Sequence, residues 1–325
     1  MGALLSLVFN VYSFASLLYP PSPRFSVDDI PDLGGQVVIV TGGYAGIGKE
    51  TVKALLQRNA KVYVAGRDKS KAASVLADLA ATTGNEPLFL ELDLASLKSV
   101  KHAADEFMSK ERELHMLFNN AGVMYPPREL VTVDGYDLQF GTNVIGHFYL
   151  TELLTPALIA GKDSAKDHHA RVITTSSGGA YFGSLNWDTF KDGPVRRGMW
   201  MPGDLYTQSK LANVVVAREV AKRYAKDGII SVSVNPGNIK SELQRHVPAV
   251  VQRVLATLIL YPTPYGALTQ LWAGTMPEVL NYNGEYLVPW ARLGRCKVEA
   301  YDPVIGERLW AWLKEQVKGV TVSEP

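Results

Sequence analysis

The sequence lacks the features that mark secreted and nucleic-acid-binding proteins. Its 325 residues include one cysteine, Cys296, and no Asn-x-Ser/Thr sequence, which excludes an internal disulfide and N-linked glycosylation. Charge of one sign is lacking too, because 33 basic and 32 acidic residues nearly cancel, so no global field attracts nucleic acid. We therefore predict a protein that faces the cytosol, is not secreted, binds no nucleic acid and contains no metal site.

The chain does have a regular alternation of two sequence patterns. Short apolar runs rich in β-branched residues are separated by segments with helical spacing. The runs cover residues 36–41, 61–65, 87–92, 114–118, 171–175 and 229–234, and the helical segments cover residues 49–58, 70–80, 96–110, 137–158 and 206–226. This alternation predicts an α/β fold with a doubly wound parallel sheet. A further run at residues 284–288 is a candidate edge strand, and we expect one domain over residues 32–325.

A glycine-rich turn, TGGYAGIGKE at residues 41–50, joins the first run to the next helical segment. Gly42, Gly46 and Gly48 would let backbone amides approach a diphosphate, which the positive end of the following helix stabilises. A tight turn can need glycines for its own sake, but the position between strand and helix favours dinucleotide binding. We assign Ile47, inside the same turn, to this site as well.

The end of the second strand, AGRDKSK, bears on the choice between NAD and NADP. A carboxylate about 20 residues beyond the glycines would bind the ribose hydroxyls of NAD, whereas an arginine accommodates the extra phosphate of NADP. Gly66 occupies the expected acidic position and Arg67 follows it, with Lys49 and Lys71 adding positive charge. Asp68 leaves an alternative open, because a shift of register would bring its carboxylate to the ribose. The sequence favours NADP(H) over NAD(H).

Four polar residues form a candidate active site. Tyr206 and Lys210, in YTQSK, share one face of a predicted helix. Ser177 closes the run RVITTSS, at the edge where open α/β sheets bind their ligands. Asn143 lies in an otherwise apolar helical segment, where an amide needs a specific partner. Each has an ordinary structural explanation alone, and together they indicate a site.

Five motifs carry a resemblance to the classical short-chain dehydrogenase/reductase family. They are TGGYAGIG, NNAG at residues 119–122, TSS at residues 175–177, YTQSK, and NPGNIKSE at residues 235–242. The resemblance runs from about residue 36 to residue 284. It implies a Rossmann-like single domain and hydride transfer between a nicotinamide cofactor and an alcohol or carbonyl compound.

The family resemblance assigns Asn143, Ser177, Tyr206 and Lys210 to a catalytic tetrad. Tyr206 would be the general acid in reduction and the general base in oxidation. We expect the Lys210 ammonium to lower the pKa of Tyr206 and to hydrogen-bond the nicotinamide ribose. Ser177 would orient the substrate oxygen, and Asn143 would hold a water between Lys210 and solvent.

The resemblance also assigns the remaining cofactor contacts. Asp93 would meet the adenine amino group, and Asn119 and Gly122 would line the adenine ribose side. The contacts beside the nicotinamide carboxamide would come from Pro236, Gly237, Ile239 and Ser241, the last in place of the commoner threonine.

The 28 residues between Ser177 and Tyr206 form an unusually long insertion. With YTQSKLANVVVARE, this insertion resembles the retinol dehydrogenase and WW-domain oxidoreductase-like branch, which implies NADP and apolar alcohols, aldehydes or ketones. Residues 247–266, expected to cover the substrate, are apolar with interspersed aromatics. A hydrophobic substrate, a homodimer partner and a membrane all fit this composition.

Residues 1–23 carry no charged side chain. A secretory signal is disfavoured, because a basic region and a clear cleavage site are missing. The apolar stretch of residues 4–19, which ends before Pro20, has about 16 residues, fewer than the roughly 20 of a membrane-spanning helix. Ser6, Asn10, Ser13 and Ser16 would form one polar stripe on a helix that either associates with a membrane or covers the enzyme's own groove. MGALLS also matches the N-myristoylation pattern, with Gly2 as acceptor.

Three functions compete on this sequence. The leading one is an NADP-dependent oxidoreductase acting on an apolar alcohol, aldehyde or ketone. An extended-type epimerase or dehydratase is disfavoured, because the glycine spacing is Gly-x-x-x-Gly-x-Gly. A cofactor-sensing dinucleotide-binding protein with little turnover is disfavoured by the intact Ser177, Tyr206 and Lys210.

Overall fold

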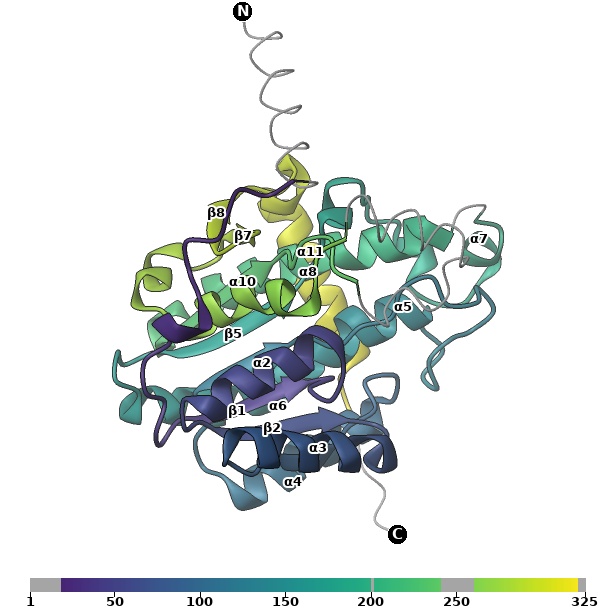
Figure 1. The fold of residues 1–325 in the computed structure, drawn as a ribbon. Coiled ribbons are helices and arrows are strands. Elements are labelled where there is room, and N and C mark those ends of the chain that lie inside the picture. The colour runs from purple at the N-terminus through teal and green to yellow at the C-terminus, as the bar shows by residue number, and fades with distance from the viewer. Residues whose placement is uncertain (1–18, 200–201, 241–259, 321–325) are drawn as a thin grey trace, which may run out of the picture.

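Eight strands form one sheet in the computed structural model, which describes residues 19–199, 202–240 and 260–320. The strand order is β3-β2-β1-β4-β5-β6-β7-β8, and neighbouring strands are parallel except for the antiparallel pair β7 and β8 (Figure 1). The strands are β1 (Val37–Thr41), β2 (Lys61–Gly66), β3 (Leu88–Glu91), β4 (Met116–Asn119), β5 (Ala170–Thr175), β6 (Ile229–Val234), β7 (Tyr286–Val288) and β8 (Arg292–Gly294). The predicted parallel sheet is confirmed. The run at residues 284–288 contains a strand, β7, as expected, but β7 is not at the edge of the sheet, because β8 pairs with its outer side.

Helices cover both faces of the sheet. One face carries α2 (Gly46–Gln57), α3 (Lys69–Thr83) and α10 (Thr263–Thr275), and the other carries α4 (Leu97–Lys110), α6 (Gly146–Ser164), α8 (Pro202–Tyr224) and α11 (Pro303–Gln316). Strand side chains alternate between the two faces: Val38 and Val40 pack in the first layer, whereas Val37 and Ile39 pack in the second. The strands are therefore apolar on both sides, as expected for a covered parallel sheet.

The remaining described helical elements are short. They are α5 (Leu138–Phe140), the π-helical turn η2 (Gly141–Ile145), α7 (Pro194–Arg197), and the 3-10 turns η1 (Val27–Asp29), η3 (Gly178–Tyr181), η4 (Trp187–Thr189), η5 (Ala225–Asp227), η7 (Pro277–Tyr282) and η8 (Val298–Tyr301). Of the described helices, the continuous stretch Leu138–Ser164 is long and apolar enough to cross a membrane. It is a core helix here, because 72% of its apolar window is buried.

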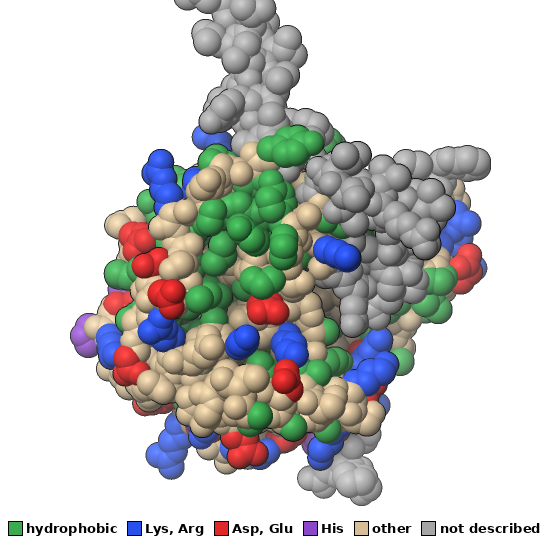
Figure 2. Space-filling view, viewed as in Figure 1, with side chains coloured by type: hydrophobic (Ala, Val, Ile, Leu, Met, Phe, Trp, Pro, Cys, Tyr) green, Lys and Arg blue, Asp and Glu red, His purple; other side chains and the backbone are tan. Residues whose placement is uncertain are grey.

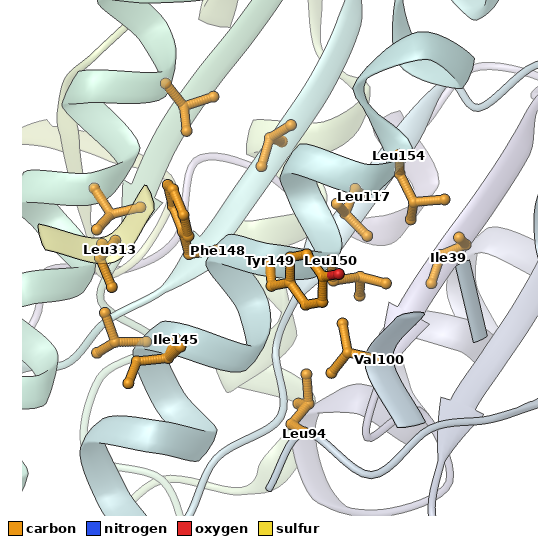
Figure 3. Packing of buried hydrophobic residues seen from close by; sticks show 14 of the residues in the cluster. Ile39, Leu94, Val100, Leu117, Ile145, Phe148, Tyr149, Leu150, Leu154 and Leu313 are labelled. Carbon is orange, nitrogen blue, oxygen red and sulfur yellow. The ribbon is translucent and has the colours of Figure 1, made fainter. Parts of the chain in front are cut away.

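The layer around α6 is the larger of the two hydrophobic clusters. Figure 3 shows side chains of α6 and the preceding turn, from Ile145 to Leu154, among side chains contributed by β1, β4, α4 and α11. Helix α6 packs into this core directly after η2, and all five residues of η2 are buried. This matters for the site, because η2 contains Asn143.

Candidate active site

The glycine-rich turn lies at the carboxyl end of β1 and leads directly into α2, which begins at Gly46. Gly42 has φ +65° and Gly46 has φ +51°, a left-handed conformation that favours glycine. A Cβ on Gly48 would lie 2.3 Å from the carbonyl oxygen of Gly42, so a side chain there cannot be accommodated. The turn thus presents bare backbone at a helix N-terminus, the arrangement that binds a diphosphate.

A cavity of about 600 Å³ opens where β2 and β3 end. Its lining consists of Arg67, Asp68, Lys69, Ser70, Lys71, Glu91, Asp93 and Ser99. Arg67 is exposed there, and Asp93 shares the cavity while its Oδ1 accepts the backbone N–H of Ala95 at 3.0 Å. The predicted contacts Arg67, Lys71 and Asp93 are therefore brought together.

Asp68 is occupied by local hydrogen bonds. Its Oδ1 accepts the backbone N–H of Lys71 at 3.0 Å and the hydroxyl of Ser70 at 2.7 Å, which caps the start of α3. These hydrogen bonds lower the pKa of Asp68 to about 2. Lys49, counted in the sequence as free positive charge, instead pairs with Asp78 at 2.8 Å. Lys71 also pairs, with the Oδ2 of Asp68 at 3.4 Å, so the remaining positive charge in the cavity lining comes from Arg67 and Lys69.

The four predicted catalytic residues meet at the carboxyl edge of the sheet. Ser177 follows β5 and hydrogen-bonds the phenol of Tyr206, near the start of α8. The Lys210 Nζ lies 5.7 Å from the centroid of the Tyr206 ring and donates to the carbonyl of Thr175 at 2.9 Å. A Cβ on Gly122 would lie 3.2 Å from the Asn143 Oδ1 and 3.6 Å from the Lys210 Nζ, so these groups share one small space.

The protonation states of Tyr206 and Lys210 are set mainly by burial. Burial raises the pKa of Tyr206 above its usual range, and the hydrogen bond from Ser177 offsets only part of this. Burial also lowers the pKa of Lys210 to about 8. The expected net lowering of the Tyr206 pKa is thus wrong for the chain by itself, because desolvation outweighs any effect of Lys210. The two residues are 5% and 3% exposed, and at such burial desolvation is the larger effect.

Known proteins resemble the chain along most of its length. It is 54% identical over 309 residues to a short-chain dehydrogenase/reductase of Armillaria gallica, covering 95% of this chain and 99% of that protein. It is 37% identical over 282 residues to retinol dehydrogenase 11 of Mus musculus, covering 86% and 85%. The chain belongs to the short-chain dehydrogenase/reductase family. The predicted resemblance to this family and to its retinol dehydrogenase-like branch is confirmed.

Solved structures and a family model agree with this family assignment. A short-chain dehydrogenase model matches residues 36–190. An uncharacterised protein of Mycobacterium paratuberculosis superimposes with a TM-score of 0.70 at 28% identity, covering 90% of this chain and 97% of that one. The Pseudomonas aeruginosa RhlG/NADP active-site complex superimposes with a TM-score of 0.62 at 25% identity, covering 80% and 96%. The chain is thus an oxidoreductase of a family that binds NAD(P).

Asn143 of this short-chain dehydrogenase/reductase uses its amide to hold the site together. Its Nδ2 donates to the carbonyl of Val123 and to the hydroxyl of Ser209, both at 3.0 Å, and its Oδ1 accepts the N–H of Val123 at 2.9 Å. Both amide hydrogens are therefore used. A water at Asn143, as the sequence predicts, would have to donate to its backbone carbonyl or to the second lone pair of Oδ1.

The NNAG motif lies at the carboxyl end of β4 and in the residues that follow it. The side chain of Asn119 is 3% exposed and donates to Thr151 of α6 at 3.0 Å, so it faces the core and not the adenine ribose. Gly122 lies beside Asn143 and Lys210. The sequence reasoning missed Asn120, whose Nδ2 donates to the carbonyl of Thr41 at 2.8 Å and braces the glycine-rich turn. The NN doublet was the available signal.

The predicted nicotinamide-side loop follows β6. Gly237 has φ +82° and lies under Trp290, because a Cβ there would be 2.9 Å from the Trp290 Cη2. Ile239 is buried and meets Ile47 of the glycine-rich turn over Gly266 of α10. The loop and the turn are thus packed together. Pro236 is part of this loop, whereas Ser241 and residues 247–259 of the predicted substrate cover lie outside the described residues.

The insertion of residues 178–205 is anchored by a buried ion pair that the sequence did not suggest. Arg196 is 1% exposed, and its Nε lies 3.0 Å from the Oδ2 of Asp137. The same guanidinium donates to the carbonyls of Arg128 and Leu130 at 2.6 and 2.7 Å. The insertion is therefore tied to the loop that leads from NNAG to α5.

Tyr125, on that loop, is a second residue that the sequence reasoning missed. Its ring meets the ring of Tyr206 edge to face, with centroids 5.5 Å apart. The backbone of Tyr125 is left-handed, with φ +52°, and its N–H donates to the Oε1 of Gln139 at 3.0 Å. Tyr125 is only partly buried, so it forms one wall beside the Tyr206 hydroxyl.

Proposed function

We propose that the chain is an NADP(H)-dependent oxidoreductase that transfers a hydride between the nicotinamide and an apolar alcohol, aldehyde or ketone. The observation that carries this is the convergence of Ser177, Tyr206 and Lys210 at the sheet edge next to a bare glycine turn. Family membership supplies the reaction class, and the tetrad supplies the proton transfer.

The residues fit a nicotinamide dinucleotide. The cradle formed by Gly42 and Gly48 would take the diphosphate, and the cavity beside Arg67 and Asp93 would take the adenosine end. When bound, the cofactor supplies or accepts the hydride. The chain's own residues must then position the substrate oxygen and move one proton.

Tyr206 supplies that proton in reduction. Because burial raises its pKa, the phenol keeps its hydrogen at neutral pH and is ready to donate to a carbonyl oxygen. Ser177 stabilises the developing charge on the same oxygen with its hydroxyl. In oxidation Tyr206 must first lose its proton, and the Lys210 ammonium beside the ring stabilises the phenolate.

Selectivity for NADP(H) rests on three features of the β2 end. Gly66 offers no carboxylate for the ribose hydroxyls, and Asp68 is occupied in capping α3. Arg67 is exposed in the cavity that would hold the ribose, where its guanidinium can bind a phosphate. One superimposable structure, RhlG, is a complex with NADP.

An apolar substrate is supported by the aromatic surroundings of the site. Tyr125 lines one side of Tyr206, and the rings of Tyr261, Tyr265 and Trp290 pack within 6.0 Å of one another beside Gly237. Figure 2 shows hydrophobic side chains gathered over α10 and β7 on this face of the molecule. Retinol dehydrogenase 11, a relative, is named for an apolar alcohol.

A substrate screen tests the function. Purified protein is mixed with NADPH or NADH and a panel of apolar aldehydes and ketones, and cofactor absorbance is followed. The proposal predicts faster oxidation of NADPH with at least one compound. If the protein binds NADPH and oxidises none, the cofactor-sensing alternative replaces it. An extended-type epimerase or dehydratase would convert its substrate and return its cofactor unchanged.

We further propose that residues 1–23 associate the protein with a membrane surface on the cytosolic side. Residues 1–18 lie outside the described part, whereas the carbonyls of Pro21 and Ser22 accept hydrogen bonds from Arg292 at 3.3 and 2.6 Å. Deleting residues 2–18 keeps those bonds and should move the protein from the membrane to the soluble fraction. A full-length protein that is already soluble contradicts this. If the deletion then lowers activity, the segment is a cover for the site.

The apolar segment 247–266 admits a second copy of the chain as well as a substrate. Light scattering of the purified protein distinguishes these. A monomer with a Michaelis constant that rises when apolar residues here are made polar supports the substrate. A dimer that dissociates in the same variants supports a homodimer interface.

A further inference from the structure

His147 is a buried titratable residue that the proposed chemistry does not use. It lies in α6, one turn after Asn143, and is 3% exposed. Its Nε2 lies 2.9 Å from the Oγ1 of Thr41, and its Nδ1 lies 3.2 Å from the backbone carbonyl oxygen of Asn143. One imidazole therefore touches both the strand end that opens the glycine-rich turn and a member of the tetrad.

The hydroxyl of Thr41 fixes the direction of the first hydrogen bond. Its oxygen accepts the backbone N–H groups of Asn120 and Ala121, both at 2.9 Å, which uses both lone pairs. The hydroxyl hydrogen can then go to the carbonyl of Phe118 at 3.2 Å or to His147 at 2.9 Å. Only the second choice gives the Nε2 a hydrogen bond, because the threonine oxygen has no lone pair left to accept one. Thr41 therefore donates to the Nε2.

The second hydrogen bond follows from the charge of the ring. Burial lowers the pKa of His147 to about 4, helped by the nearby charge of Lys210, so the imidazole is neutral near pH 7. A neutral ring carries one N–H. Because the Nε2 is an acceptor, this hydrogen is on the Nδ1 and points to the Asn143 carbonyl. Two hydrogen bonds in one direction therefore connect Thr41 to His147 and His147 to Asn143.

Each end of this hydrogen-bonded series contacts further residues of the candidate site. At one end, Thr41 holds the N–H groups of Asn120 and Ala121, and Asn120 braces the turn expected to bind the diphosphate. At the other end, Asn143 lies in the π-helical turn η2, a backbone feature that often marks functional positions. The Asn143 amide in turn holds Val123 and Ser209 beside Tyr206.

We propose that His147 is a positioning residue that couples the cofactor-binding turn, through Thr41, to the catalytic tetrad, through Asn143. The inference rests on the proposed function, because it assigns the two ends their roles. An apolar side chain would fill the same space. It would leave the Asn143 carbonyl without this donor and let Thr41 turn to Phe118.

Two substitutions separate the two ends. In His147→Gln the amide reaches the position of the Nε2 and retains the Thr41 contact, whereas in His147→Asn it reaches the position of the Nδ1 and retains the Asn143 contact. The loss of one hydrogen bond corresponds to about 3–10-fold in an equilibrium or rate constant. His147→Gln should therefore lower kcat about 3–10-fold with the Kd for NADPH near wild type. His147→Asn should raise that Kd about 3–10-fold with kcat near wild type at saturating NADPH.

His147→Leu removes both contacts and should show both defects. His115 provides the matched control: it is 1% exposed and also bridges two elements, with Val37 N–H donating to its Nδ1 at 2.9 Å and its Nε2 2.8 Å from Ser164. It lies where β1 and β4 begin, at the opposite edge of the sheet. His115→Leu should lower the melting temperature and leave kcat and Kd unchanged.

Cofactor fluorescence gives the Kd, steady-state reduction gives kcat, and circular dichroism gives the melting temperature. The proposal is overturned if His147→Gln and His147→Asn show the same pattern, or if all defects follow the loss of melting temperature as in His115→Leu. If the wild-type protein reduces no compound, the proposed function fails. The predicted difference in Kd between the Gln and Asn variants still tests the Thr41 contact independently.

Discussion

The ring of Tyr44 lies over Gly66 so closely that a Cβ built on this glycine would be 2.2 Å from the Tyr44 Cε1. Gly66 ends β2, at the position where NAD-dependent proteins of this architecture carry an acidic side chain. The tyrosine thus closes the place that a carboxylate would need. The lack of an acid there is enforced by packing inside the glycine-rich turn.

Opening that place should shift cofactor selectivity. Gly66→Asp alone is expected to weaken both NAD(H) and NADP(H), because the new side chain displaces Tyr44 and disturbs the turn. The double variant Gly66→Asp/Tyr44→Ala provides space for the carboxylate and should bind NADH better than the wild type does. Titration of both cofactors checks this. A double variant that still prefers NADPH as strongly as wild type would show that Tyr44 is not the barrier.

Arg67 is expected to bind the extra phosphate of NADP. Losing a charge-assisted hydrogen bond is worth about 1.5–3 kcal/mol, so Arg67→Ala should weaken NADPH about 10–100-fold. NADH, which lacks the phosphate, should be affected far less. Arg67→Lys is the control and should retain part of the affinity. Equal losses for the two cofactors would refute the assignment.

We expect the buried charge of Lys210 to lower the free energy of unfolding, although the residue is needed for turnover. Its pKa in the folded protein is lowered from 10.5 to about 8 by burial. Between these values the unfolded chain binds more protons, so wild-type stability rises with pH there, and the full cost is present below pH 8. Lys210→Met should raise the free energy of unfolding at pH 7 by about 1–3 kcal/mol while abolishing turnover.

The Lys210→Met gain should shrink as the pH approaches 10, because the wild-type lysine is then neutral in the folded state. The carbonyl of Thr175 remains satisfied, since Asn213 donates to it at 3.1 Å. Urea denaturation at pH 7 and pH 10 measures the difference. A variant that is less stable than wild type at pH 7, or whose gain does not change with pH, contradicts the argument.

The buried pair of Arg196 and Asp137 should dominate the stability of the insertion. Arg196→Met leaves the Asp137 carboxylate buried without its charge partner, which typically costs about 3–5 kcal/mol. Adding Asp137→Asn removes the charge and should restore part of the loss. Arg197, 69% exposed in its ion pair with Asp192, is the control: Arg197→Met should change stability by less than about 1 kcal/mol. Similar losses for both arginines would show that burial is not the cause.

The sheet and the meeting of the tetrad were predictable because both follow from strand order. Ser177 follows a parallel strand and Tyr206 lies near the start of the next long helix, so the carboxyl edge brings them together whatever the intervening loop does. Side-chain direction was less accessible. Asn119 and Asn120 are adjacent at the end of β4, where successive side chains point to opposite faces, and the sequence does not say which one faces α6.

Long-range contacts were not predictable from local patterns. Arg196 lies in a polar insertion beside Arg197, a pattern that predicts an exposed charge. Its burial instead depends on an ion pair with Asp137, which is distant in the sequence. His147 occupies a helical position that suits any residue of its size, and only the distances to Thr41 and Asn143 reveal a role. The pKa of Tyr206 was misjudged for a similar reason. A neighbouring lysine is visible in YTQSK, whereas the burial that outweighs it is not.

The most direct test of the account is the Tyr206→Phe variant. The substitution removes only the phenol oxygen, and the remaining ring can keep its contact with Tyr125. General acid catalysis contributes about 100–10,000-fold, so kcat for NADPH-dependent reduction should fall by that factor while the Kd for NADPH stays within about 2-fold of wild type. A Tyr206→Phe variant that reduces its substrate at a rate close to wild type would contradict the proposed mechanism.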